Sequence, residues 1–307
     1  MANELIRKQL FGVEIEMTGI GRGKAADIIA EHFSSTVTGP FGSVYKERRV
    51  KDRAGRTWKI MRDSSISPQP YDDEFRVEVV TPPLNYEDIE DLQEVIRKLR
   101  KAGGIANSSC GIHIHVDGAN HTPESLLHLV NFMIGRQDLI YESLEIGERA
   151  GHWCKKLNTK ILEALKSTQS LTFDDVKRIW YSDANDGYRE GIRTDEHYNY
   201  TRYHGVNLHA FFSKGTVEFR LFNSTLHAGK IKAYIQFCLA VSAWSISTPS
   251  RISFRSSASY TPEKKIQLMR SVLTHRLGLK GKEFRTCRIH LLNPLRSAAG
   301  LPVKGVA

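Results

Sequence analysis

The sequence predicts an α+β fold in which helices surround one sheet rich in antiparallel strands. Segments of alternating apolar and polar residues predict strands, and segments with apolar residues every three or four positions predict helices. These segments do not follow a regular strand–helix–strand rhythm, so a doubly wound parallel sheet is not expected. The chain has 307 residues, of which 40% are hydrophobic, and shows no internal repeat or linker. We therefore expect a single domain over residues 1–307, with a helical C-terminal extension over about 228–307.

The predicted elements follow from local patterns along the chain. Strands are expected over residues 10–17, 75–80 and 111–117, and in two hairpins over 44–63 and 205–222. Helices are expected over residues 24–33, 86–102, 123–146, 154–166, 173–181, 230–247, 262–277 and 282–298. The turns of the hairpins are placed at residues 52–55 and 213–215. The polar stretch 182–202 is expected to form a loop.

Composition excludes several classes of protein. No run of eighteen apolar residues is present, and the first residues lack the apolar stretch of a secretory signal. The four cysteines form no CxxC pair, which is typical of reduced thiols and not of a disulfide framework or a zinc knuckle. We therefore expect a cytoplasmic protein with no membrane-spanning segment.

The formal net charge of +10 has two interpretations. A solvated basic surface explains it most simply. An anionic partner, such as a nucleotide or a polyanionic substrate, is the alternative. No recognition helix, zinc finger or aromatic RNA-binding motif accompanies the basic residues, so nucleic acid is not the expected partner.

Four of the predicted strands carry acids or imidazoles at alternate positions, with apolar residues between them. Alternate residues of a strand point to the same face of a sheet, so each strand presents one apolar and one polar face. The polar faces are formed by Glu14 and Glu16, by Glu78, by His113, His115 and Asp117, and by Glu218 and Arg220.

A single strand of this kind is typical of a sheet with one face in solvent. If all four strands share one sheet, however, their acids and imidazoles converge on one face. Such crowding of carboxylates requires compensating cations, because like charges at close range raise each other's pKa. Ligand sets dominated by carboxylates suit Mg²⁺ or Mn²⁺.

The order of these motifs resembles that of the amidoligases, a family related to glutamine synthetase and γ-glutamylcysteine ligase. The motifs are GVEIE, RDSSI, EVVTPP, GIHIHV and TVEFRLFNSTL, between Gly12 and Leu226, and residues 277–295 are also similar to the family. The resemblance implies a glutamine synthetase-like fold, with a curved antiparallel-rich sheet and helices packed on its outer face.

The resemblance also implies two metal positions. Glu14, His113 and Glu218 match the ligands of the metal that contacts the transferred phosphate. Glu16 and Glu78 match ligands of a second metal, nearer the acceptor carboxylate.

Other residues match positions whose roles leave alternatives open. Asp63 matches either a third metal ligand or a group that binds the incoming amine. Arg220 matches the arginine that neutralises the phosphoryl group, and His115 matches a histidine that contacts nucleotide in glutamine synthetase but not in the thiol-amino-acid ligases. Arg202 and Asn207 lie where relatives place substrate- or phosphate-binding groups. A surface arginine and a hydrogen bond at a strand end are the alternatives for these two.

The activity that the resemblance implies is an ATP- and magnesium-dependent ligation of a carboxylate to an amine. It proceeds through an acyl-phosphate, releases ADP and uses two or more metal ions. The substrates would be amino acids, peptides or proteins. The chain has no GxxxxGK[ST] loop, so side chains and metals would bind the phosphates.

Two other classes of function remain open at this point. A metal-dependent hydrolase could use His113 and His115 as a metal-binding pair. A non-enzymatic anion-binding protein would explain the charge but not the acids on the sheet.

Overall fold

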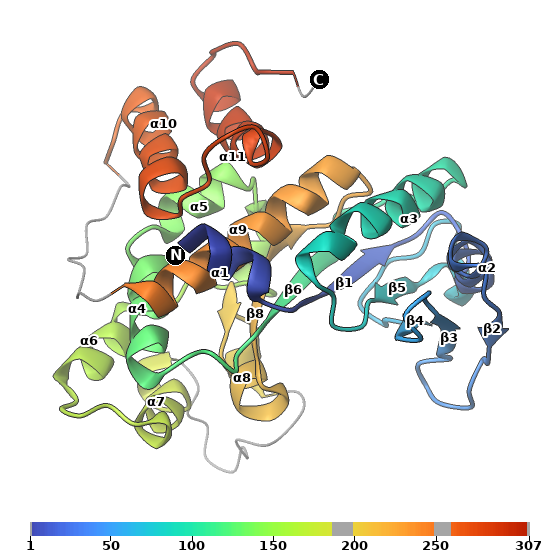
Figure 1. The fold of residues 1–307 in the computed structure, drawn as a ribbon, viewed down its shortest axis with the longest axis horizontal. Helices are drawn as coiled ribbons and strands as arrows, with labels where there is room; N and C mark the ends of the chain where they lie inside the picture. Colours follow the sequence, from blue (N-terminus) through green and yellow to red (C-terminus); the bar gives the residue numbers. More distant parts are fainter. Residues whose placement is uncertain (1, 186–198, 249–258, 306–307) are drawn as a thin grey trace. The chain divides into compact units, whose positions relative to one another are not determined.

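The computed structural model describes residues 2–185, 199–248 and 259–305 (Figure 1). It contains an open sheet with the strand order β2-β3-β4-β5-β1-β6-β8-β7. This mixture of helices and an antiparallel sheet confirms the α+β class. The strands are β1 (Phe11–Met17), β2 (Val37–Thr38), β3 (Arg48–Lys51), β4 (Thr57–Met61), β5 (Val77–Val80), β6 (Gly111–Asp117), β7 (Val206–Asn207) and β8 (Thr216–Asn223).

The chain divides into two compact units. Unit 1 consists of Met1–Gln9, His115–Leu221 and Gln236–Ala307, and unit 2 consists of Leu10–Ile114 and Phe222–Ile235. The strands β6 and β8 and the helix α9 (Ala228–Ser247) each contribute residues to both units.

Unit 2 is built on the antiparallel pairing of β1 with β5 and of β5 with β4. The apolar positions of these strands are fully buried, as the alternation of the sequence requires, and include Val13, Ile15, Ile60 and Val79. The helix α2 (Arg22–Phe33) packs against β3, β4 and the helix α3 (Ile89–Lys101). The alternate positions of β1 and β5 carry the acidic side chains of Glu14, Glu16 and Glu78.

Unit 1 is mainly helical. Its helices are α1 (Ala2–Lys8), α4 (Pro123–Ile134), α5 (Gln137–Ser143), α6 (Thr159–Ser167), α7 (Phe173–Trp180), α8 (His209–Lys214), α10 (Pro262–Ser271) and α11 (Arg285–Ala298). Among them α4, α6 and α7 pack together, and α11 packs against α5 and α10. The strands β8 and β7 pair in this unit, with Asn207 opposite Glu218.

Several element boundaries differ from the sequence-based expectations. The helix expected over residues 123–146 is interrupted at Gly135 and Arg136, which separate α4 from α5. The prediction of a hairpin over residues 205–222 is wrong at residues 209–214, which form the helix α8. The Asn207 side chain accepts a hydrogen bond from the His209 N–H, and Gly215, at φ +74°, ends the helix.

Smaller differences lie at the ends of other elements. The helix expected from residue 154 begins only at Thr159, after the capping residue Asn158. The short elements α1 and β2 were not expected. Within the expected loop 182–202, residues 186–198 lie outside the described part of the chain.

All four cysteines are buried, and none of them forms a disulfide in the structure. No helix in the described part of the chain combines the length and the apolar character that crossing a bilayer requires.

His121 is a buried imidazole that makes the stability of unit 1 depend on pH. Its ring nitrogens lie 2.9 Å from Ser125 Oγ and 2.9 Å from Ser242 Oγ. Burial lowers the pKa of His121 to about 4, although the charge of Asp117 acts in the opposite direction. The folded protein therefore keeps this imidazole neutral at pH values where the unfolded chain is protonated.

We expect His121 to contribute a loss of stability as the pH falls from about 6.5 to about 4. Over that range the unfolded state binds a proton that the folded state does not, which amounts to about 3 kcal/mol. Urea unfolding at several pH values should show this slope in the wild type and a shallower slope in H121Q. The exposed His152 is the matched control, so H152Q should keep the wild-type slope. Equal slopes in H121Q and the wild type would contradict the prediction.

Candidate functional site

The polar face of unit 2 brings acids from two neighbouring strands together. Glu14 and Glu16 alternate with buried apolar residues on β1, and Glu78 on β5 lies directly opposite Glu16 in the antiparallel register. Glu16 is 4% exposed and Glu78 is 8% exposed. Two buried carboxylates at opposed positions repel each other, so this arrangement favours a bound cation.

His113 on β6 lies among these acids. Its Nδ1 is 2.9 Å from Glu14 Oε2, and its Nε2 is 3.8 Å from Glu16 Oε1. The backbone N–H of Gly111 donates to Glu16 Oε2 at 2.6 Å, so the beginning of β6 helps to orient that carboxylate.

Asp63 joins this set from the loop after β4. Glu16, Asp63 and Glu78 each offer an oxygen, and these atoms lie within 4.8 Å of one another. The Asp63 carboxylate accepts hydrogen bonds of 2.6 Å from the Ser65 N–H and from Ser65 Oγ. Arg76 donates to the carbonyl oxygens of Ser64 and Ile66 and so fixes the loop that carries Asp63.

The donor atoms of unit 2 fit a divalent cation. Glu16, Asp63 and Glu78 form an all-carboxylate set of the kind that suits Mg²⁺ or Mn²⁺. Glu14, Glu78 and His113 form a second set with one imidazole, and Glu78 belongs to both. The hard oxygen donors and their burial together favour a metal over an unliganded cluster.

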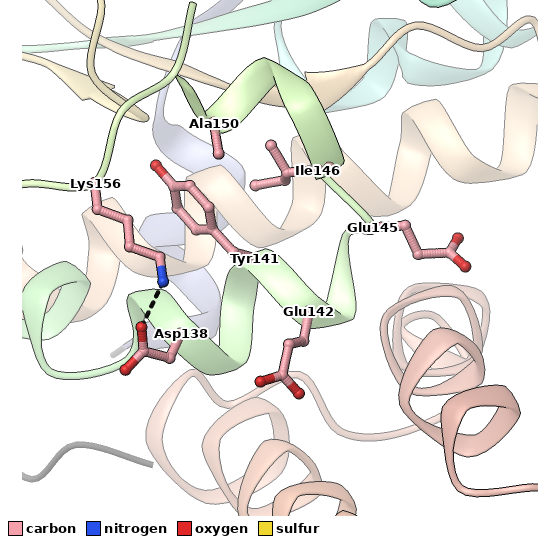
Figure 2. Close-up of a pocket in the computed structure, with 8 residues that line it drawn as sticks. Asp138, Tyr141, Glu142, Glu145, Ile146, Ala150 and Lys156 are labelled. Carbon is pink, nitrogen blue, oxygen red and sulfur yellow. Dashed lines mark hydrogen bonds and ion pairs between the residues drawn. The ribbon is translucent and has the colours of Figure 1, made fainter. Parts of the chain in front are cut away.

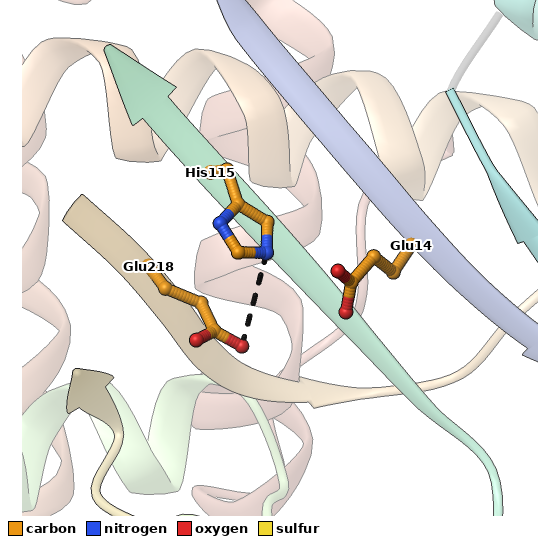
Figure 3. Close-up of side chains that lie close together, drawn as sticks. All are labelled: Glu14, His115 and Glu218. Atoms are coloured by element: carbon orange, nitrogen blue, oxygen red, sulfur yellow. Dashed lines mark ion pairs between the residues drawn. The ribbon is translucent and has the colours of Figure 1, made fainter. Parts of the chain in front are cut away.

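The polar face of unit 1 is organised around Glu218 on β8, which is 3% exposed. Its Oε1 accepts a hydrogen bond from Arg220 Nη1 at 2.5 Å, and its Oε2 accepts one from Asn207 Nδ2 at 2.6 Å. His115 Nε2 lies 3.9 Å from Glu218 Oε1 (Figure 3). Its other ring nitrogen is 3.0 Å from Thr216 Oγ1, which orients the imidazole.

Arg220 and Arg202 meet at an aromatic ring that the sequence interpretation had not singled out. Their guanidinium carbons lie 5.9 Å and 5.7 Å, respectively, from the centre of the Tyr203 ring. The Tyr203 ring also contacts Trp153 edge-on at 5.6 Å. Asn207 and Arg220 are almost completely buried, and Arg202 is half-buried. No motif of the sequence pointed to Tyr203, because it is one of several tyrosines in a polar stretch and nothing in the pattern distinguishes it.

A pocket of about 480 Å³ lies elsewhere in unit 1, around α5 and the following turn (Figure 2). Two of its three acids are paired with lysines: Asp138 lies 2.6 Å from Lys156 Nζ, and Glu142 lies 2.7 Å from Lys265 Nζ. The Tyr141 hydroxyl donates to the Cys154 carbonyl oxygen at 2.7 Å. None of the expected site residues lines this pocket, and we assign it no catalytic role.

The structure thus gathers the expected residues into two sets. Unit 2 holds Glu14, Glu16, Asp63, Glu78 and His113, and unit 1 holds His115, Arg202, Asn207, Glu218 and Arg220. The two implied ligands of the second metal, Glu16 and Glu78, are neighbours in unit 2 together with Asp63.

The comparisons with known proteins identify the family to which the chain belongs. A family model described as "Putative amidoligase enzyme" matches residues 7–242, which include both sets of site residues. No curated protein sequence matches the chain. The match covers well over half of the 307 residues, so the chain belongs to the amidoligase family.

Proposed function

We propose that the protein is an ATP- and magnesium-dependent carboxylate–amine ligase that forms an amide through an acyl-phosphate intermediate. The observation that supports this proposal best is the all-carboxylate set of the buried Glu16 and Glu78 and the half-buried Asp63 in a chain of the amidoligase family. A carboxylate is a poor electrophile, so an amine attacks it only after activation. Transfer of the γ-phosphoryl group supplies that activation.

The first step would join an oxygen of the substrate carboxylate to the γ-phosphorus and release ADP. Magnesium ions held by the acids of unit 2 would offset the charge of the phosphates. Arg220 would donate to the oxygens of the transferred group, since its guanidinium is already oriented by Glu218.

In the second step the amine would attack the acyl carbon, and inorganic phosphate would leave with the former carboxylate oxygen. The attacking nitrogen must lose a proton. Asp63 would accept that proton if it is not a metal ligand, because its carboxylate is half-buried and held in place by Ser65. The substrates would be an amino acid, peptide or protein carboxylate and a primary amine, and we place the reaction in the cytoplasm.

The proposal predicts that ADP release requires an acid, an amine and magnesium together. A panel of amino acids and peptides, assayed in pairs, should reveal ADP in stoichiometric amounts with a product that is one water lighter than the two substrates combined. ADP release that needs neither an acid nor an amine would contradict a ligase. Formation of AMP would contradict the acyl-phosphate route.

A further inference from the structure

Asp73 is a carboxylate that four basic side chains of unit 2 surround. It lies in the connection between β4 and β5, and its Oδ1 is 2.6 Å from Arg62 Nε and 3.7 Å from Arg76 Nε. Its Oδ2 is 2.9 Å from Lys46 Nζ and 3.3 Å from Arg22 Nη2. The hydrogen bond from Arg62 is the main reason that the pKa of Asp73 lies well below its usual range, so the carboxylate is ionised. One charge thus links four separate segments of the chain.

Arg62 connects Asp73 to the candidate metal ligand Asp63. Arg62 directly precedes Asp63 in the chain. Its side chain donates to Asp73, and its backbone N–H donates to the Tyr45 carbonyl oxygen at 2.7 Å. Both the backbone and the side chain of the residue before Asp63 are therefore held in place.

Arg76 holds the residues that follow Asp63. Its Nη1 donates to the Ser64 carbonyl oxygen at 2.6 Å and also to the Ile66 carbonyl oxygen. Its Nε lies near the same Asp73 oxygen that accepts the hydrogen bond from Arg62. The segment that carries Asp63 is therefore held on both sides by arginines that share one carboxylate oxygen.

Arg22 fixes the position of Asp73 itself. It is the first residue of α2 and is 1% exposed. Its Nη1 donates to the carbonyl oxygens of Asp73 and Arg76, at 2.5 and 2.9 Å, and its Nη2 donates to Glu74 Oε2 at 2.9 Å. Because α2 packs against β3 and β4, these bonds hold the Asp73 backbone relative to the sheet.

The three carboxylates of the all-carboxylate set differ in how the fold positions them. Glu16 and Glu78 lie opposite each other on paired strands, so the sheet sets their positions. Asp63 lies in a loop, and one of its oxygens is within 4.8 Å of two other carboxylates that repel it. Mg²⁺ requires nearly ideal octahedral geometry, so displacement of one ligand weakens binding. Residues that orient such a ligand therefore also control metal affinity.

We propose that Asp73 is a positioning residue that keeps Asp63 in the metal-binding arrangement through Arg62 and Arg76. This role rests on the proposed function, which places magnesium at the acids of unit 2. Asp73 belongs to none of the possible metal-binding groups found among the described residues, so it acts through the loop that it braces.

D73N removes the charge that holds both arginines and keeps the size of the side chain. We expect it to raise the dissociation constant for manganese about tenfold to a hundredfold, as loss of a group that orients a metal ligand does. Titration calorimetry of the full chain with manganese chloride, without nucleotide, measures this constant. The matched control is D72N, because Asp72 is an exposed carboxylate one residue away that accepts a hydrogen bond from the Glu74 N–H at 2.7 Å. D72N should bind manganese as the wild type does.

R62Q separates positioning from a simple effect of charge. Removal of a positive charge near a cation site would by itself strengthen manganese binding. Loss of the brace should weaken it, so we expect R62Q to raise the dissociation constant although a positive charge is lost. R97Q is the control, at an exposed ion pair of α3, and should leave the constant unchanged. The sign of the R62Q effect decides the question even if D73N does not fold.

The double variant D63N/D73N shows whether Asp73 acts through Asp63. If it does, D73N should have no further effect once the ligand is lost, so D63N and D63N/D73N should agree within about twofold. Losses that add in the double variant would overturn the proposal, and so would wild-type manganese affinity in D73N or R62Q. If the wild type binds no manganese, or if D63N binds it as the wild type does, the proposed metal site fails and the role of Asp73 fails with it.

Discussion

Replacing Arg220 with lysine is expected to lower turnover by about a hundredfold or more, because lysine loses the planar pair of donors that the transferred phosphoryl group requires. Nucleotide affinity should change by no more than about threefold, since lysine keeps the positive charge that contributes to ground-state binding. Arg220 is 5% exposed and oriented by Glu218, so its donor geometry is set before substrate binds. Steady-state assays of ADP release, together with calorimetry of a non-hydrolysable ATP analogue, measure the two quantities separately.

The control for R220K is R178K, an arginine-to-lysine change at an exposed ion pair of unit 1. It should leave both turnover and affinity unchanged. The melting temperature of R220K should stay close to that of the wild type, because lysine can still pair with the buried Glu218. Wild-type turnover in R220K would contradict the role assigned to Arg220.

Magnesium is expected to stabilise the wild-type protein and to have little effect on E78Q. Glu78 belongs to both potential metal-binding groups of unit 2, so E78Q removes a charged ligand from each of them. A ligand at a hundred times its dissociation constant contributes about 2.7 kcal/mol to the free energy of unfolding. In the absence of metal, E78Q should melt at a higher temperature than the wild type, because the substitution removes one of two opposed buried carboxylates that repel each other. Melting curves with chelator, with magnesium and with manganese test both statements.

E94Q is the matched control for E78Q. Glu94 lies on α3 of unit 2, its side chain is 55% exposed, and it pairs only at the surface with Arg97. We expect E94Q to keep the full magnesium-induced shift, since exposed ion pairs contribute little to stability. A wild-type melting temperature that does not depend on divalent cations would contradict the metal site.

The strands and their polar faces could be predicted from the sequence. Apolar and polar residues alternate along these segments, and this alternation assigns each side chain to one face of the strand. The strand Gly111–Asp117 has the bounds expected, and Glu14, Glu16 and Glu78 lie on the polar face that alternation assigns. Burial of Val13 and Ile15 on the other face fixes the register of β1. The side chains of Glu14 and Glu16 must therefore lie on the opposite, polar face.

The features that the sequence interpretation missed depend on tertiary context. Residues 209–214 carry no strong helical pattern, and they form α8 between Asn207, whose side chain accepts a hydrogen bond from the His209 N–H, and Gly215, which ends the helix. Arginine is usually exposed, so the burial of Arg149 cannot be anticipated from its neighbours in the chain. Only the folded structure shows that its side chain is 8% exposed.

Activation of a carboxylate by phosphorylation can be tested by following the carboxylate oxygen. When the screen has identified an acid and an amine that release ADP, the acid is labelled with oxygen-18 in its carboxylate. We expect one labelled oxygen to appear in inorganic phosphate for each amide formed, because the amine displaces phosphate from the acyl carbon. Label in AMP, or product formed by addition of water without nucleotide cleavage, would contradict it.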